Sequence, residues 1–225
     1  MSRSLLDTKT RYLQLAFNYD LALAKQIIPS LPQNERIFIE AGTPYIKYEG
    51  MRGVREMRRL WKGQIVADLK ISDGGRQEVE MAHDAGATAV TALGSSPVET
   101  LDRFVIRCAE LSVISMVDML GVEDPLEKIM RMRRPPDVVI LHRGRDEEST
   151  RGKVIQYRHV NRLRSKFDVV ISAAGGVDLR EARSAIFNGA NIVVVNLVKP
   201  GDEWQGIPTD QDVPAIAAEF LVTIE

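Results

Sequence analysis

The chain has little of what secreted, membrane-spanning or nucleic-acid-binding proteins require. It contains a single cysteine, Cys108, in 225 residues, which excludes an internal disulfide framework and a multi-cysteine zinc site. No stretch approaches the ~20 apolar residues of a membrane span, and the amino terminus has no apolar run of signal-peptide length. The formal net charge is -1, so no overall positive charge attracts nucleic acid or anionic membrane. We therefore expect a cytoplasmic protein without a nucleic-acid or membrane partner.

What the sequence does contain is a regular series of short apolar, β-branched runs. Their starts lie about 23 to 31 residues apart, close to the length of one strand-helix-return unit. Continuous apolar runs are typical of strands that are covered on both faces, as in a parallel sheet with helices outside. The eight runs occupy residues 13–17, 37–41, 65–69, 88–93, 113–119, 138–141, 169–173 and 192–195.

Segments between these runs have helical patterns. Residues 75–86 and 178–189 each end in a glycine suited to a C-cap, and Asp178 is placed to cap the second segment at its start. Eight strand-helix units in this length predict an α/β protein with a (β/α)8 TIM barrel. Because no linker or composition break divides residues 1–225, we expect a single domain. An open, doubly wound sheet is the alternative.

Polar residues follow the predicted strands at the ends where a barrel places its active site. For any one of them, a solvated loop position is the alternative interpretation. Together they gather ionisable groups at one rim. They are Asn18, Glu40, Asp68, Lys70, Asp73, Asp118, His142, Arg143, Arg145, Gly175, Gly176 and Asn196.

The segment Asp-Leu-Lys-Ile-Ser-Asp at residues 68–73 is the most specific of these strand ends. Asp68 and Lys70 alternate with apolar residues, so both side chains should point into the barrel mouth. A lysine between carboxylates is held in its cationic form, and it can stabilise an oxyanion or deliver a proton to a carbanion. A structural ion-pair network is the alternative.

Two further groups of residues suggest ligands. Glu40 and Asp68 come from adjacent strand ends, and carboxylate oxygens with open water positions suit Mg²⁺. His142 is a candidate acid or base, with a structural hydrogen-bonding role as the alternative, whereas His83 and His159 lie in helical segments and are expected at the surface. Gly175 and Gly176 are typical either of a phosphate-binding loop or of a tight turn.

These motifs resemble the orotidine 5'-phosphate decarboxylase suprafamily, whose shared pattern D-x-K-x-x-D matches residues 68–73. The resemblance extends over nearly the whole chain. Residues 39–50 resemble the second-strand motif of the branch that contains 3-hexulose-6-phosphate synthase and 3-keto-gulonate-6-phosphate decarboxylase. Residues 116–124, which include Asp118, look most like the synthase. In residues 141–148, Arg145 resembles the decarboxylase, whereas the Asp-Glu-Glu tail resembles the synthase.

The resemblance implies that Glu40 and Asp68 bind Mg²⁺, that Lys70 lies near the reacting oxygens, and that His142 transfers the proton. It also implies a homodimer in which Asp73 reaches the neighbouring subunit's site. The family chemistry runs through an enediolate of a pentulose phosphate. A synthase adds this enediolate to formaldehyde, starting from ribulose 5-phosphate, whereas a decarboxylase generates it by losing carbon dioxide.

The chain departs from the family pattern at two places. The first-strand aspartate that helps to bind substrate is Asn18 here. Where the family has a glycine after the eighth strand, this chain has Asn196-Leu197. The larger side chains remove the room that the backbone needs to approach a phosphate closely. Asn196 and Lys199 are candidate substitutes, and a ligand without the usual phosphate is the alternative.

Three functional hypotheses follow. The first is a Mg²⁺-dependent lyase of the hexulose-phosphate synthase type acting on a sugar phosphate, which the run around Asp118 favours. The second is a decarboxylase of a 3-keto sugar acid phosphate, which Arg145 favours. The third is a divergent barrel that takes another ligand or has no catalytic role. We further expect Cys108 to be buried in the helix after the fourth strand.

Overall fold

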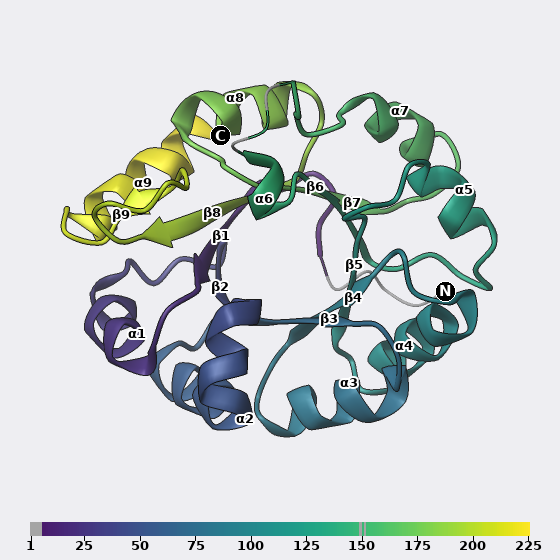
Figure 1. Cartoon of the computed structure of the whole chain (residues 1–225), viewed down its shortest axis with the longest axis horizontal. Helices are drawn as coiled ribbons and strands as arrows, with labels where there is room; N and C mark the ends of the chain where they lie inside the picture. The colour runs from purple at the N-terminus through teal and green to yellow at the C-terminus, as the bar shows by residue number, and fades with distance from the viewer. Residues whose placement is uncertain (1–5, 149, 151) are drawn as a thin grey trace.

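The strands of the computed structural model, which describes residues 6–148, 150 and 152–225, form a closed parallel barrel (Figure 1). Each strand pairs with the next, and β1 also pairs with β8, with Tyr12 opposite Ile192 and Leu15 opposite Val195. This closure confirms the predicted (β/α)8 barrel and excludes the open sheet. The barrel strands are β1 (Tyr12–Phe17), β2 (Ile37–Ala41), β3 (Gln64–Ile71), β4 (Ala89–Leu93), β5 (Ile114–Asp118), β6 (Val138–His142), β7 (Val170–Ala174) and β8 (Ile192–Val198).

Helices surround the barrel in the connections between strands (Figure 1). The expected helices over 75–86 and 178–189 are present as α3 and α8, and the Asp178 side chain accepts the Glu181 backbone N–H at 2.7 Å, as predicted for the N-cap. The helical elements are α1 (Leu21–Ile27), the 3-10 helix η1 (Ile28–Ser30), α2 (Thr43–Leu60), α3 (Gly75–Asp84), α4 (Val98–Glu110), α5 (Pro125–Met130), α6 (Arg145–Glu148), α7 (Arg158–Arg164), α8 (Leu179–Phe187) and α9 (Val213–Thr223).

The strands bury both of their faces, which explains why their sequences are continuously apolar. One set of alternating residues packs outward against the helices, as Leu13, Leu15 and Val117 do. The other set fills the barrel interior, and it includes Tyr12, Ala16, Phe38, Val66, Ala89, Ile114, Met116, Val138, Ile140, Val170, Ala174, Ile192 and Val194. Because side chains alternate along a strand, these inward positions predict which residues face the barrel mouth.

The eighth strand is longer than its apolar run predicts. It continues to Val198 and pairs with a short strand, β9 (Ile207–Pro208), in which Ile207 lies opposite Leu197. Both of these residues are buried in the core. The connection over residues 199–206 therefore folds back across the end of β8, and Gly206 lies so close to Asn196 that a Cβ there would stand 2.1 Å from the Asn196 carbonyl oxygen.

Other expectations can be compared with the structure. Cys108 is buried in α4, directly after β4, as predicted, and burial raises the pKa of its thiol. His83 is exposed, as expected. The expectation for His159 was wrong: it is 4% exposed, because α7 turns it toward the core. Within the described residues no helix has the length and apolar character to cross a membrane. The expectation for the amino terminus falls partly on residues 1–5, outside the described residues.

Candidate active site

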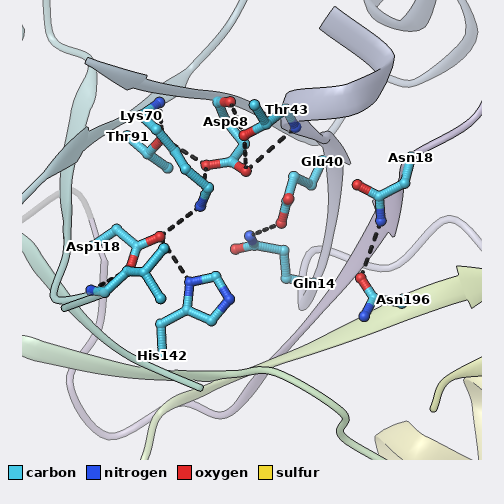
Figure 2. Close-up of polar contacts among 11 residues, drawn as sticks. Gln14, Asn18, Glu40, Thr43, Asp68, Lys70, Thr91, Asp118, His142 and Asn196 are labelled. Carbon is cyan, nitrogen blue, oxygen red and sulfur yellow. Dashed lines mark hydrogen bonds and ion pairs between the residues drawn. The ribbon is translucent and has the colours of Figure 1, made fainter. Parts of the chain in front are cut away.

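The inward-facing positions of the strands continue into polar side chains at the carboxyl ends, where they line a cavity of about 480 Å³. Asp68 follows Val66, Asp118 follows Met116, and His142 follows Ile140, each two residues further along its strand. The predicted site residues that line the cavity are Asn18, Glu40, Asp68, Lys70, Asp118, His142, Arg145, Gly175 and Asn196. The close-up in Figure 2 shows most of them converging on one space.

Lys70 lies between two carboxylates, as its position in the sequence predicts. Its Nζ is 2.6 Å from Asp118 Oδ2 and 3.3 Å from Asp68 Oδ1. Burial alone would lower the pKa of Lys70, but the charges of Asp68 and Asp118 outweigh burial and raise it. The side chain is therefore a fixed cation, able to stabilise negative charge that develops on a ligand oxygen.

The backbone of β3 is irregular at Lys70. The residue has a φ of 47°, and the pairing with β4 shifts between Ala67 and Ile71. The Lys70 N–H donates to Thr91 Oγ1 at 2.9 Å, which satisfies the donor that the bulge removes from the ladder. Bulges of this kind re-aim side chains next to functional sites.

Asp68 is held in place by two threonines that the sequence analysis missed. Thr43 Oγ1 donates to Asp68 Oδ2 at 2.7 Å, and Thr91 Oγ1 donates to Asp68 Oδ1 at 2.8 Å. Thr91 could have been found by its inward position two residues after Ala89 in β4. Thr43 begins α2 just after β2, and only the tertiary structure shows that it contacts Asp68.

Asp118 connects the lysine to the histidine (Figure 2). His142 Nδ1 lies 2.8 Å from Asp118 Oδ2, while the Leu120 N–H donates to Asp118 Oδ1 at 3.0 Å. Burial would raise the pKa of Asp118, but His142 and Lys70 lower it, so Asp118 remains an anion. Burial would likewise lower the pKa of His142, but Asp118 outweighs this effect and raises it. Because Asp118 binds Nδ1, Nε2 is the ring nitrogen that faces the cavity.

Glu40 and Gln14 form the opposite side of the cavity. Gln14, which the sequence analysis missed although it shares the inward positions of β1, donates from Nε2 to Glu40 Oε2 at 2.5 Å. Burial and the charge of Asp68 raise the pKa of Glu40 to about 7. Within the described part of the chain, Gln14 Oε1 is buried without a hydrogen-bond partner.

These oxygen atoms fit a divalent cation. The charge of Asp68 repels the Glu40 carboxylate and raises its pKa, and a cation bound between the two would relieve this repulsion. Carboxylate and amide oxygens are hard ligands suited to Mg²⁺. The described residues hold no cluster of three or more His, Cys, Asp or Glu side chains with metal-binding geometry. The protein would therefore supply few ligands and leave the remaining positions to water and substrate, as magnesium sites commonly do.

The structure places the residues predicted to bind substrate in different surroundings. Asn18 Nδ2 donates to Asn196 Oδ1 at 3.1 Å, where β1 meets β8. The Arg145 guanidinium lies 3.9 Å from the centre of the Trp204 ring. Gly175 and Gly176 both have positive φ, 104° and 61°, so the turn after β7 requires glycine at each position.

Four predicted residues do not line the cavity of this chain: Asp73, Arg143, Gly176 and Lys199. Gly176 lies in the turn behind Gly175. Lys199 is directed elsewhere, with its Nζ 4.6 Å from the centre of the Tyr19 ring and 3.8 Å from Asp20 Oδ2. Asp73 is exposed and accepts the Gly74 N–H at 2.7 Å.

Comparison with known proteins identifies the family to which the chain belongs. The model of the orotidine 5'-phosphate decarboxylase / HUMPS family matches residues 11–196, and the chain therefore belongs to this family. The bifunctional enzyme Fae/Hps of Methanothrix thermoacetophila is 35% identical over 212 residues, which are 93% of this chain and 52% of that protein. The Fae/Hps enzyme of Methanosphaera stadtmanae is 36% identical over 218 residues, with the same coverage. The chain thus spans about half the length of these curated relatives.

Solved structures share the fold. A 3-hexulose-6-phosphate synthase superposes with a TM-score of 0.76 at 26% identity, over 95% of this chain and 100% of that chain. The synthase from Salmonella typhimurium has a TM-score of 0.82 at 24% identity, over 95% and 98% of the two chains. KGPDC from Streptococcus mutans has a TM-score of 0.75 at 20% identity, over 95% and 97%. The last two similarities establish the barrel alone.

Proposed function

We propose that the protein is a Mg²⁺-dependent carbon-carbon lyase of the 3-hexulose-6-phosphate synthase type, which adds formaldehyde to ribulose 5-phosphate or catalyses the reverse reaction. The observation that carries this proposal is the chain of contacts from Asp68 through Lys70 and Asp118 to His142. Through these contacts the cationic Lys70 and the candidate base His142 line the same cavity. The Fae/Hps relatives and the similar synthase structure support the choice of reaction.

The side chains divide the reaction between them. His142 Nε2 accepts the proton from carbon 1 of the sugar, while Asp118 stabilises the imidazolium through Nδ1. The Lys70 ammonium donates to the oxygen that gains negative charge. Magnesium held by Glu40 and Asp68 would supply a Lewis acid for two neighbouring sugar oxygens. The hydrogen bonds from Thr43 and Thr91 keep Asp68 in one orientation, in which it can contact Lys70 and would bind magnesium.

The second candidate is decarboxylation of a 3-keto sugar acid phosphate. Arg145 favours this reaction, because its side chain lines the cavity and adds a positive charge at the mouth. Its guanidinium stacks on the Trp204 ring. Asp118 favours the synthase, because it resembles the residue of that enzyme at the same strand end. We therefore place the decarboxylase second.

The test is a formaldehyde-consumption assay with ribulose 5-phosphate, run with Mg²⁺ and with EDTA. Consumption that depends on Mg²⁺ is the expected result, together with its loss in His142→Ala. His83→Ala is the matched control, because it removes an exposed histidine of α3 outside the cavity, and it should keep full activity. Carbon dioxide release from the keto acid, without formaldehyde consumption, would select the decarboxylase. No turnover of either substrate by folded protein would reject both lyase proposals in favour of a barrel with another ligand.

A further inference from the structure

The glycine turn after β7 is covered by side chains from the segment that follows β6. Arg143 Nη2 donates to the Gly175 carbonyl at 3.0 Å and reaches the Gly176 carbonyl at 3.5 Å. Glu148, the last residue of α6, approaches the same turn. A Cβ added to Gly176 would stand 2.2 Å from Arg143 Nη2 and 2.9 Å from Glu148 Oε2.

The Glu148 carboxylate lies among groups that attract an anion. Burial raises the pKa of Glu148, while the backbone N–H of Gln205 and the positive charges of Arg143 and Arg145 oppose this shift. Glu148 also lines the same cavity as Lys70 and His142. Among the described residues, Glu148 Oε2 is buried without a hydrogen-bond partner. A buried oxygen without a partner is less stable than one in water, so the carboxylate is held only weakly at this turn.

The connection between β8 and β9 completes these surroundings. It brings Trp204 beneath the Arg145 guanidinium and Gln205 to Glu148. It is anchored where Gly206 packs on Asn196 and where β9 pairs with β8. Trp204 and Gln205 lie beyond residues 11–196, the span that the family model matches. The connection lies next to the Asn196-Leu197 step, which stands where the family pattern has a glycine step.

We propose that Glu148 is a binding-site residue whose carboxylate occupies the position of the substrate's phosphate in the ligand-free protein and so lowers the affinity for phosphate ligands. A sugar phosphate then binds by displacing Glu148, and the positive charges of Arg143 and Arg145 attract the phosphate that takes its place. The identity of the ligand rests on the proposed function.

Displacement follows from charge. A phosphate monoester carries nearly two negative charges and three strong acceptor oxygens, so it outcompetes a carboxylate for the two arginines. The two anions cannot share the turn, because they repel each other in a partly buried space. The free energy needed to release Glu148 lowers the affinity for every phosphate ligand by the same factor.

The experiment measures binding apart from turnover. Inorganic phosphate and ribulose 5-phosphate are titrated by calorimetry, in EDTA and without formaldehyde, into the wild type, Glu148→Gln and Glu219→Gln. Glu148→Gln keeps the shape of the side chain and removes its charge, and it should bind both ligands about tenfold more tightly. Glu219→Gln makes the same chemical change at an exposed position of α9 outside the cavity, and it should change affinity less than about twofold. Glu148→Ala, checked for folding by circular dichroism, should shift affinity in the same direction as Glu148→Gln.

The outcomes separate this inference from the proposed reaction. Tighter phosphate binding in Glu148→Gln without any lyase activity would support the role of Glu148 and reject the reaction. Normal activity in the wild type with unchanged or weaker binding in both Glu148 variants would overturn the role of Glu148, as would the absence of phosphate binding in every variant. If the enzyme turns over, Glu148→Gln should lower KM about tenfold without raising kcat, because the proposed effect is on binding.

Discussion

At the scale of single residues, the cavity depends on a few buried charges that stabilise one another. Lys70 has a carboxylate on either side, and Asp118 lies between the Lys70 ammonium and the His142 ring. Taking such charges out of water is expensive, and the cost is recovered only while each one keeps its partner. The site is therefore sensitive to single substitutions, although the apolar core is formed elsewhere.

Replacing Lys70 tests the role of its ammonium. Lys70→Ala should lower kcat of the proposed lyase about 100-fold or more, the usual effect of removing an oxyanion-stabilising group. Steady-state kinetics measure the loss, and circular dichroism checks the fold. Lys166→Ala, which removes an exposed lysine after α7, should leave kcat unchanged. Near-normal turnover in Lys70→Ala would contradict the mechanism.

The pKa of His142 tests the contact with Asp118. The anion of Asp118 stabilises the imidazolium and so raises the pKa of His142. Asp118→Asn removes this charge, and the pKa should fall by about one unit or more, the usual effect of a neighbouring opposite charge. His142 then loses its proton at a lower pH. Because it acts as a base only when it is deprotonated, the acidic limb of the kcat/KM profile should also move to lower pH.

NMR titration of the histidine ring protons in EDTA measures this pKa directly, and His142→Asn assigns the resonance. An unchanged or higher pKa in Asp118→Asn would show that the contact does not control the charge of His142.

At the scale of secondary structure elements, each strand supplies the site through its inward side chains, and each following helix turns the chain back to the start of the next strand. α8 illustrates how local chemistry sets such a helix. The Asp178 side chain accepts the Glu181 N–H, while Gly189, with a φ of 94°, follows the helix at its other end. α8 directly follows the Gly175-Gly176 turn, so its start also supports the rim of the cavity.

Removing the cap of α8 should lower stability measurably. Asp178→Ala should cost about 1 kcal/mol, which corresponds to a fall in Tm of about 2–4 °C for a domain of this size. Differential scanning calorimetry measures the shift. Arg180→Ala, an exposed position on the same helix, should change stability by less than about 0.5 kcal/mol. Equal effects of the two variants would mean that the Asp178 hydrogen bond contributes nothing to the stability of α8.

At the scale of the whole molecule, closure between β1 and β8 brings residues from both ends of the chain into one site. The contact between Asn18 and Asn196 joins the first and last barrel strands. Asp73 is the exception among the predicted site residues, because it is exposed and lies outside this chain's cavity. We still predict a homodimer in which Asp73 of one subunit reaches the active site of the other.

Complementation tests that prediction. Lys70→Ala and Asp73→Ala homodimers should each be inactive. A heterodimer of the two, isolated with two affinity tags, should have one intact site and about half of the wild-type activity. A heterodimer that carries Lys70→Ala in both chains is the control and should be inactive. A monomer in analytical ultracentrifugation, or full activity of Asp73→Ala, would contradict the shared site.

The local sequence determined the positions of the strands and most of the cavity residues. Apolar runs and capping residues act over a few neighbours, and side chains alternate along a strand wherever it lies. The inward direction of Glu40, Asp68, Asp118 and His142 therefore followed from residues close to them in the chain. Asp178 was identifiable as an N-cap for the same reason.

Only the tertiary structure decided which distant groups meet. The bulge at Lys70 depends on pairing with β4, and the support of Asp68 by Thr43 depends on how α2 packs on β3. The burial of His159 and the addition of β9 to β8 likewise depend on packing between elements. Lys199 is turned toward Tyr19, and Glu148 toward Gly176, by contacts between segments far apart in sequence. Such contacts form only after the barrel has closed, because closure is what brings these segments within reach of one another.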